Sequence, residues 1–423
     1  MFKHLIKFLL IFFILTLVIS KKSFAENIER YELLDLFGQI FDEVRKNYVE
    51  EVTDKELIEK AIDGMLTGLD PHSGYLSEED WKDMQLDTSG KFGGLGIEIT
   101  MDEGFIKVVS PIEDTPAYKA GIEAGDYIIQ IDDTPVLGLN ISEAVEIMRG
   151  KVGTPITLTI SREGTEPFEV KIVRDIIKIQ SVKFEIFDNV GYLRITSFTE
   201  QANEGVKKAI QKIKDKLNKK EIGYILDVRS NPGGLLDQAI KVTDAFLEQG
   251  EIVSTRGREK NDIRRYRARK GDLTNGKPLV VIINAGSASA SEIVAGALQE
   301  HKRAIIIGTS SFGKGSVQTI IPFKKPVMSG IRLTTARYYT PSGKSIQGKG
   351  IDPDIIIEQG KFESADFKTF SESDLKNSLD KDENNEKEII EDSPETERLK
   401  LDFQLARAVE IIKSIDIYKE SLN

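Results

Sequence analysis

The sequence predicts an α/β core, preceded by an inserted β-rich module and an N-terminal helical domain. Three patterns along the 423 residues indicate this fold class. Apolar residues keep a helical spacing between residues 28 and 88, short β-like runs separated by turns fill residues 92–174, and strands alternate with helices over residues 190–357. Alternation of the last kind is typical of a parallel or mixed sheet with flanking helices.

The first 25 residues have the pattern of a secretory signal peptide. Lys3 and Lys7 give a basic start, Phe8–Ile19 is a run of 12 residues with one polar member, and residues 23–25 (Ser-Phe-Ala) form a small-x-small site. The run is shorter than the about 20 residues that a membrane span needs. We therefore expect cleavage after Ala25 and an exported protein, periplasmic or in the cell envelope. The alternative is a retained segment that anchors the chain in the inner membrane.

Residues 26–88 are expected to form the small helical domain. Apolar side chains recur at helical spacing from Leu33 to Val44 and again from Leu57 to Met65. Residues 69–73 (Leu-Asp-Pro-His-Ser) then end the second helix, because proline cannot continue it.

Residues 89–175 are expected to form the compact β-rich module. The apolar runs Phe105–Val109, Tyr127–Ile131 and Ile156–Ser161 predict strands, and Ser142–Met148 predicts one short amphipathic helix.

Residues 176–360 are assigned to the α/β core. The predicted strands are Val190–Ile195, Tyr224–Val228, Leu279–Ile283 and Ala304–Ile307. The predicted helices are Glu200–Leu217, Leu236–Leu247 and one that runs from Ser289 to about Glu300.

Charge and composition exclude several kinds of function. A net charge of −11 argues against nucleic-acid binding, and the absence of cysteine excludes disulfides, a thiol nucleophile and a thiolate metal site. Residues 361–397 hold most of the acidity, with 13 acids against four bases from Glu363 to Glu397, and are predicted to be a disordered linker. Residues 398–423 predict a final amphipathic helix that docks on its own domain, or on a partner subunit or an adaptor.

Only three histidines are available as a general base for a serine nucleophile. His4 belongs to the predicted signal peptide, and His72 lies in the turn that ends a helix. His301 follows the helix that begins near Ser289, so a rise of about 1.5 Å per residue places it roughly 18 Å away. A Ser-His-Asp triad is therefore not expected. No His-x-x-x-His pattern or similar cluster supports a metal site, and no cofactor is expected.

Lysine is the remaining candidate base. A neutral lysine amine can take a serine proton where burial or neighbouring charges lower its pKa. Lys314 lies in a glycine-flanked loop, residues 312–318 (Phe-Gly-Lys-Gly-Ser-Val-Gln), and Gly315 stands where a phosphate-binding loop would need Ser or Thr. Alone, this loop identifies no function, and the serines of residues 286–292 (Gly-Ser-Ala-Ser-Ala-Ser-Glu) could each be helix caps.

Together these two segments closely resemble the carboxyl-terminal processing (tail-specific) serine proteases, peptidase family S41. The resemblance implies that Ser289 is the nucleophile, that Lys314 is its general base and that Gln318 supports the lysine. The separation of 25 residues between Ser289 and Lys314 also matches the family. The resemblance to this family also implies a crotonase-like core. It extends over residues 30–357 and continues into the final helix. One departure is Glu300, where many members have aspartate, and this puts a structural contact in doubt.

The tetrahedral oxyanion of acyl transfer needs two backbone donors. The N–H group of Ala290, at the start of the predicted helix, is one candidate. Residues 227–234 (Asp-Val-Arg-Ser-Asn-Pro-Gly-Gly) resemble the family's Asp-x-Arg-x-Asn-Pro-Gly-Gly segment, which implies that Gly233 or Gly234 supplies the other.

A glycine-rich loop precedes the β-rich module and comprises Gly94, Leu95, Gly96 and Ile97. Successive N–H groups in such a loop can hold a chain-terminal carboxylate, while an extended peptide adds a strand beside residues 96–99. With residues 116–122 (Pro-Ala-Tyr-Lys-Ala-Gly-Ile) and 125–131 (Gly-Asp-Tyr-Ile-Ile-Gln-Ile), the loop resembles a PDZ domain. The partners implied are proteins or peptides with free C-terminal tails. Arg149 is a candidate for a regulatory contact with the core.

Two other interpretations use the same residues. A catalytically silent PDZ scaffold that only binds tails would have no need of Ser289, Lys314 and Gln318 together. A crotonase-like enzyme would share the α/β outline and the backbone oxyanion donors, but not the PDZ module or the signal peptide. The sequence therefore favours an exported serine endopeptidase with a Ser–Lys dyad.

Overall fold

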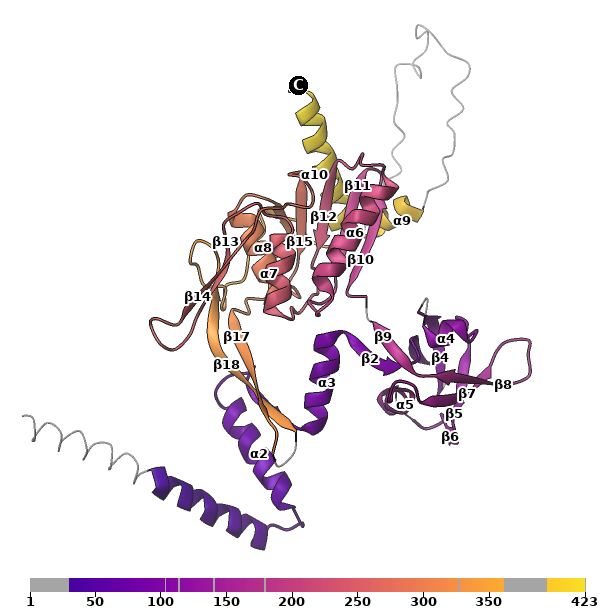
Figure 1. The fold of residues 1–423 in the computed structure, drawn as a ribbon, viewed down its shortest axis with the longest axis vertical. Helices are drawn as coiled ribbons and strands as arrows, with labels where there is room; N and C mark the ends of the chain where they lie inside the picture. Colours follow the sequence, from indigo (N-terminus) through magenta and orange to yellow (C-terminus); the bar gives the residue numbers. More distant parts are fainter. Residues whose placement is uncertain are drawn as a thin grey trace, which may run out of the picture. The chain divides into compact units, whose positions relative to one another are not determined.

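The computed structural model describes residues 30–102, 104–112, 115–139, 141–178, 180–325, 328–360 and 394–422 (Figure 1). The predicted signal peptide and nearly all of the predicted acidic linker lie outside these residues. Two compact units make up the chain, one of Met1–Glu79 with Gln318–Thr334 and one of Asp80–Val317 with Thr335–Asn423. Part of the segment assigned above to the core therefore belongs with the N-terminal helices.

The first unit combines helices with a short antiparallel sheet. Residues 30–47 are helical, and α2 (Asp54–Thr67) begins with a capping box between Thr53 and Glu56. Strand β1 (Gly74–Leu76) pairs with β18 (Ser329–Tyr339), which also pairs with β17 (Ser316–Phe323). The Asp70 carboxylate accepts hydrogen bonds from the hydroxyls of Ser73 and Thr334, at 2.7 and 3.1 Å, and so fastens the helix-ending turn to β18.

The β-rich module forms one sheet and a two-stranded ribbon. The sheet has the order β3-β4-β5-β7-β8, and its strands are Ile97–Asp102, Phe105–Pro111, Tyr127–Ile131, Pro155–Ser161 and Phe168–Val173. The short β6 (Thr134–Pro135) pairs with β5, and β2 (Lys91–Gly94) pairs with β9 (Asp175–Lys178). Helices α3 (Glu78–Ser89), α4 (Pro116–Lys119) and α5 (Ile141–Met148) complete this part of the chain. The predicted strands and the predicted short helix are confirmed.

The core is built on a six-stranded mixed sheet of order β10-β11-β12-β15-β16-β19. Its strands are Val182–Phe187, Val190–Ile195, Gly223–Asp227, Leu279–Ile283, Ile305–Gly308 and Ile355–Ile356. Only the pairing of β10 with β11 is antiparallel, and every other neighbouring pair is parallel. The carboxyl ends of β12, β15 and β16 therefore meet at one edge of the sheet.

Helices cover both faces of this sheet. Val281 and Ile283 of β15 pack into a cluster with α6 (Ala202–Lys216), α7 (Leu236–Asp244) and α8 (Ala290–Glu300). Val280 and Ile282 pack into a second cluster with α10 (Phe403–Glu420), which follows α9 (Pro394–Leu401). Successive residues of a strand point to opposite faces, so the apolar run predicted for β15 buries both of its sides. The α/β fold class is confirmed, and the final helix docks on its own domain.

The remaining strands β13 (Glu251–Arg256) and β14 (Ile263–Arg267) pair with each other, and β13 pairs with the end of β18.

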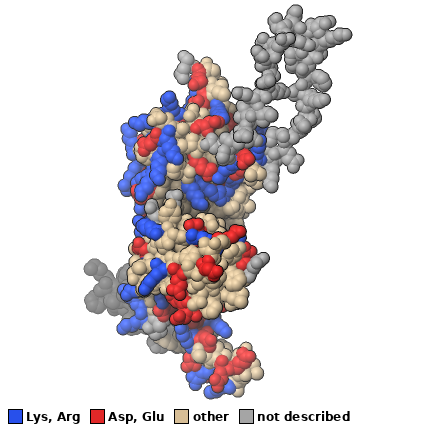
Figure 2. Space-filling view, turned by 90° about the vertical axis from the view of Figure 1, so that its right-hand side faces the viewer, with Lys and Arg blue, Asp and Glu red and all other residues tan. Residues whose placement is uncertain are grey.

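Charge is unevenly spread over the second unit. Helix α6 exposes four lysines, Lys207, Lys208, Lys212 and Lys216, and Figure 2 shows basic side chains over much of the core surface that it presents. Among the helices of the described residues, none is both long and apolar enough to span a membrane.

Candidate active site

Three sequence segments that carry candidate site residues follow three neighbouring parallel strands of the core sheet (Figure 1). Strand β12 leads into the loop with Gly233, β15 into the loop with Ser289, and β16 into the loop with Lys314. The order β12-β15-β16 places the serine loop between the other two. Active sites of open α/β sheets lie at such carboxyl edges, so the sheet order itself assembles a candidate active site.

Ser289 occupies a strained position at the start of α8. It is the N-cap of the helix, has φ 56° and ψ −109°, and is 8% exposed. A non-glycine residue held at positive φ between a buried strand and a helix is the arrangement of a nucleophile elbow, which presents a hydroxyl at the top of a sheet. The geometry of Ser289 therefore suits a nucleophile better than a simple helix cap.

The two neighbouring serines have structural roles instead. The Ser287 hydroxyl donates to the carbonyl of Val228 at 2.8 Å, and the Ser291 hydroxyl donates to the carbonyl of Asn231 at 2.9 Å. Both hydroxyls are fully buried, and both bonds fasten the serine loop to the segment that follows β12. Of the three serines that the sequence left open as caps, two hold the loop in place.

Glu292 joins the serine loop to the lysine loop. Its carboxylate is fully buried, and its Oε2 accepts from the backbone N–H groups of both Ser289, at 2.7 Å, and Lys314, at 2.9 Å. Its Oε1 accepts from the Ser311 hydroxyl and the Gly313 N–H, each at 2.6 Å. The candidate nucleophile and the candidate base are thus fixed to a single oxygen atom through their backbones. Glu292 is not among the site residues predicted from the sequence, although its Ser-x-x-Glu spacing is a capping signal.

The loop around Lys314 is held by further contacts. The Phe312 N–H donates to the Ser287 carbonyl at 3.0 Å, and the Gly315 N–H donates to the Gln347 side chain at 3.0 Å. A Cβ atom at Gly315 would lie 2.3 Å from the Gln347 nitrogen, so only glycine allows this approach. The Lys314 side chain is partly exposed at the end of this packed loop.

Of the two candidate oxyanion glycines, Gly233 is the one that approaches the serine loop. It has φ +107°, and a Cβ atom there would lie 2.9 Å from the Ser289 Cβ and 3.1 Å from the Ala290 nitrogen. Its own N–H donates to Asn231 Oδ1 at 2.9 Å. Ala290 is the first residue of α8, where helix N–H groups lack intrahelical partners. Gly234, at φ +137°, packs against the Phe198 backbone.

The remaining candidates lie elsewhere. His301 is the C-cap of α8, as expected, and its Nε2 lies 2.7 Å from the Glu251 carbonyl oxygen. His72 and Gln318 belong to the first unit, where the Gln318 amide donates to Thr334 at 3.2 Å. The support of Lys314 by Gln318 stays a prediction. Within the described residues, no three His, Asp or Glu side chains gather as a metal site.

The glycine-rich loop leads into the edge of the module's sheet. Strand β3, which begins at Ile97, has β4 as its one partner among the described strands, so its outer edge is free of a paired strand there. Leu95 is buried in the module core, and the Gly96 carbonyl accepts from the Ile112 N–H at 2.8 Å. Gly94 ends β2. Arg149 belongs to the same module, and the central carbon of its guanidinium lies 4.9 Å from the centroid of the Phe92 ring.

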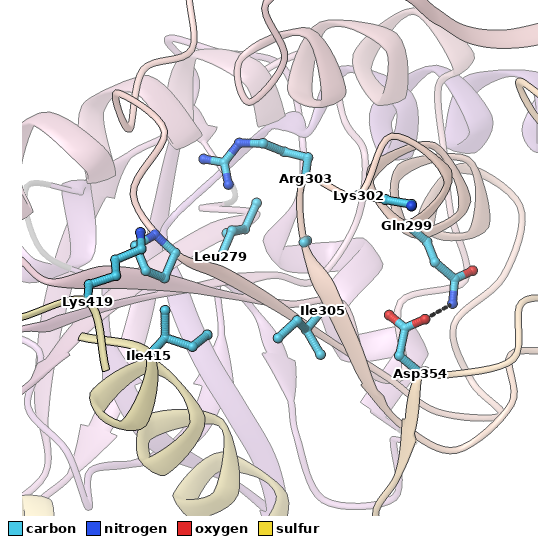
Figure 3. A pocket seen from close by; sticks show the side chains of 10 residues that line it. Leu279, Gln299, Lys302, Arg303, Ile305, Asp354, Ile415 and Lys419 are labelled. Carbon is cyan, nitrogen blue, oxygen red and sulfur yellow. Dashed lines mark hydrogen bonds between the residues drawn. The ribbon is translucent and has the colours of Figure 1, made fainter. Parts of the chain in front are cut away.

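An open pocket lies at the opposite edge of the core sheet, at the amino ends of β15 and β16 (Figure 3). Apolar side chains from the two strands and from α10, those of Leu279, Ile305 and Ile415, line it together with charged ones. The Gln299 amide donates to the Asp354 carboxylate at 2.9 Å beside it. Its lining includes none of the candidate site residues.

Comparison with known proteins identifies the family. Residues 189–357 match the model of peptidase family S41, residues 107–162 match a PDZ domain, and residues 17–80 match the N-terminal domain of the activating protease CtpB. A carboxy-terminal-processing protease of Bartonella bacilliformis is 56% identical over 373 residues, which cover 86% of this chain and 85% of that protein. The chain belongs to peptidase family S41. It is a carboxy-terminal processing serine protease with a PDZ domain.

A second relative agrees with this assignment. The carboxy-terminal processing protease CtpA of Bacillus subtilis is 36% identical over 343 residues, covering 81% of this S41 chain and 72% of that protein. Among solved structures, the photosystem II D1 C-terminal processing protease is 28% identical, with 76% of this chain and 92% of that one covered and a TM-score of 0.45. The predicted family, fold class and enzyme class are confirmed, and the scaffold and crotonase-like interpretations are set aside.

Proposed function

We propose that this S41 protease cleaves peptide bonds with Ser289 as nucleophile and Lys314 as general base. One observation carries the proposal: the carboxylate of Glu292 accepts hydrogen bonds from the backbones of both residues, on loops that follow adjacent parallel strands. A lysine is the base that remains available, because His301 caps the far end of α8. Gln318 is proposed to support the lysine, as the family resemblance implies.

The proposed reaction proceeds through an acyl-enzyme. The neutral Lys314 amine takes the Ser289 hydroxyl proton as the oxygen attacks the scissile carbonyl. The N–H groups of Ala290 and of Gly233 or Gly234 stabilise the tetrahedral oxyanion, with Gly233 released from Asn231 to take part. The lysine then gives its proton to the leaving amine. In the second half of the reaction a water molecule attacks the ester, the lysine takes a proton from that water, and the same proton is returned to the Ser289 oxygen as the acid product leaves.

Substitution of the dyad tests the proposal. Ser289→Ala, Lys314→Ala and Lys314→Arg should each abolish cleavage of an unstructured protein, because a guanidinium stays charged and cannot act as base. His301→Ala is the control and should keep cleavage within a few-fold of wild type, with products read by mass spectrometry. Activity should rise with pH as the lysine loses its proton. A folded Lys314→Ala variant that cleaves at the wild-type rate would refute the dyad.

Substrates of this PDZ-containing protease are peptides, and we propose that it selects them by their free C-terminal tails. The loop from Gly94 to Ile97 would hold the terminal carboxylate with backbone N–H groups, and the tail would add a strand to the open edge of β3. The position of β3 at the edge of its sheet supports this mode.

We also propose that the protease acts after export. The basic start, the apolar run and the small-x-small site of residues 1–25 support this location. Cleavage after Ala25 would release it into the periplasm or cell envelope, and retention would anchor it in the inner membrane. A partner subunit or adaptor that binds the C-terminal helix stays a prediction.

A further inference from the structure

The last segment of the chain contacts the strand that leads to the proposed oxyanion loop. Arg229, two residues after the end of β12, is 8% exposed and donates to both carboxylate oxygens of Asp402, at 2.8 and 2.7 Å. It also donates to the Gln404 amide oxygen at 3.0 Å. Asp402 and Gln404 stand at the start of α10, which lies outside the residues that match the S41 family model.

A second carboxylate holds Arg229 from the other side. Asp227, the last residue of β12, is fully buried and accepts from Arg229 Nη2 at 2.7 Å and from Arg194 Nη1 at 3.1 Å. The Tyr192 hydroxyl donates to the same carboxylate at 2.7 Å. Two arginines thus face two aspartates, and the loss of Asp402 would leave one cation of this buried cluster uncompensated.

Independent contacts hold Asp402 where it is. It is the N-cap of α10 and accepts from the Leu405 N–H at 3.1 Å. Leu405, Ala408 and Val409 are buried against the face of the core sheet opposite to α8. Because this apolar face fixes the helix, Asp402 cannot simply follow a displaced Arg229. The C-terminal helix therefore restricts the position of the Arg229 side chain through its ion pair with Asp402.

Arg229 also begins the loop that carries the oxyanion glycines. The next residue but one, Asn231, accepts the Gly233 N–H through its side chain and the Ala288 N–H, at 3.0 Å, through its carbonyl. This loop is thus anchored at one end by the Arg229 cluster and along its length by the serine loop. A shift of Arg229 would be passed through the backbone to Gly233, where an added Cβ atom would lie only 2.9 Å from the Ser289 Cβ.

We propose that Asp402 is a positioning residue for catalysis, because its ion pair with Arg229 holds the oxyanion loop in register with Ser289. The docked C-terminal helix is then required for the full rate of the chemical step, and not only for stability. This inference rests on the proposed function. Burial alone would raise the pKa of Asp402, but the hydrogen bond and charge of Arg229 outweigh it and hold the pKa below its ordinary value, so the pair is ionised at neutral pH.

The test compares Asp402→Asn with Glu410→Gln in the full chain. Both variants remove one negative charge from α10, but Glu410 is exposed and, among the described residues, forms its ion pair with Arg407 of its own helix. We expect Asp402→Asn to lower kcat by about 10- to 100-fold with KM nearly unchanged, because displaced donors weaken transition-state binding. Affinity for a peptide boronate, whose tetrahedral adduct places an oxygen in the oxyanion site, should fall by the same factor. Glu410→Gln should match wild type in both measurements.

Further readouts separate positioning from folding and from the dyad. Rates are measured well below the thermal midpoint and divided by the number of sites that a fluorophosphonate labels, and Asp402→Glu, which keeps the charge, should recover part of kcat. Binding of a tail peptide to the PDZ domain should not change. Equal kcat per labelled site in Asp402→Asn and Glu410→Gln would overturn the positioning role, as would an Asp402→Glu variant no faster than Asp402→Asn. Cleavage by Ser289→Ala would instead refute the proposed function.

Discussion

Replacement of Glu292 by glutamine tests whether one carboxylate fastens the two proposed catalytic loops together. Glutamine has nearly the same shape but only one acceptor oxygen, and its NH₂ group is a donor. Two of the four donors that now face Glu292 would therefore meet another donor. Whichever way the amide turns, either the pair Ser289 and Lys314 or the pair Ser311 and Gly313 loses its acceptor.

The size of the effect follows from these contacts. A hydrogen bond to a charged group contributes about 1.5–3 kcal/mol, so the loss of two such bonds should lower the free energy of unfolding by about 3–6 kcal/mol. For a domain of about 150–250 residues, a range that includes the predicted core of residues 176–360, each kcal/mol shifts the thermal midpoint by about 2–4 °C, which gives roughly 6–24 °C. Looser loops should also lower kcat by about 100-fold, since a displacement of about 1 Å between reacting groups has that effect.

Glu300→Gln is the matched control, at the other end of the same helix. Glu300 accepts hydrogen bonds from the Thr340 hydroxyl and from the backbone and hydroxyl of Ser342, but contacts neither proposed catalytic loop. Thermal unfolding and steady-state cleavage of a fluorogenic peptide would be measured for both variants at one temperature below both midpoints. The reasoning is refuted if Glu292→Gln loses no more kcat than Glu300→Gln.

Four further predictions, three of them on the fold or its site and one on the N-terminal sequence, can be tested separately. Gly233→Ala should lower kcat by more than about 100-fold, because the added Cβ would meet Ser289. Gly276→Ala is the control, since Gly276 is also at positive φ but has open space around it, and this variant should lose only stability. Equal kcat values for the two variants would show that Gly233 does not approach Ser289 closely in solution. Amidation of a substrate's C-terminus should raise KM, and equal turnover of the acid and amide forms would show that the PDZ domain reads another feature. The pKa of Asp402 is lowered, so its ion pair with Arg229 stabilises the fold above the ordinary carboxyl range, and this stability is lost as pH falls through the lowered pKa. The free energy of unfolding measured in urea should therefore fall more steeply with acidification for wild type than for Asp402→Asn. Mass spectrometry of the exported protein should find Glu26 as its first residue, and the intact start would indicate an anchor instead.

Several elements could be predicted from the sequence because their signals are local. The predicted strands Val190–Ile195 and Leu279–Ile283 match β11 and β15 at both ends. The second is a continuous apolar run, and the first is mainly apolar, with Gly191 and Arg194 as its exceptions. Strand β14 escaped prediction because its sequence, Ile-Arg-Arg-Tyr-Arg, is exposed and has no apolar periodicity. The pairing of residues 318–334 with the N-terminal unit escaped as well, because a strand pairing across the chain leaves no local pattern.

The candidate site divides along the same line. The resemblance of two sequence segments to the family predicted roles for Ser289 and Lys314, and a third segment predicted the oxyanion glycines, because the family keeps these groups in recognisable runs. Only the tertiary structure revealed Glu292 and Asp402 as the groups that hold these segments. Glu292 reaches partners on a loop about 20 residues ahead, and Asp402 reaches Arg229 across 173 residues. Contacts of that range depend on which strands become neighbours in the sheet, and strand order is decided by the packing of the whole core.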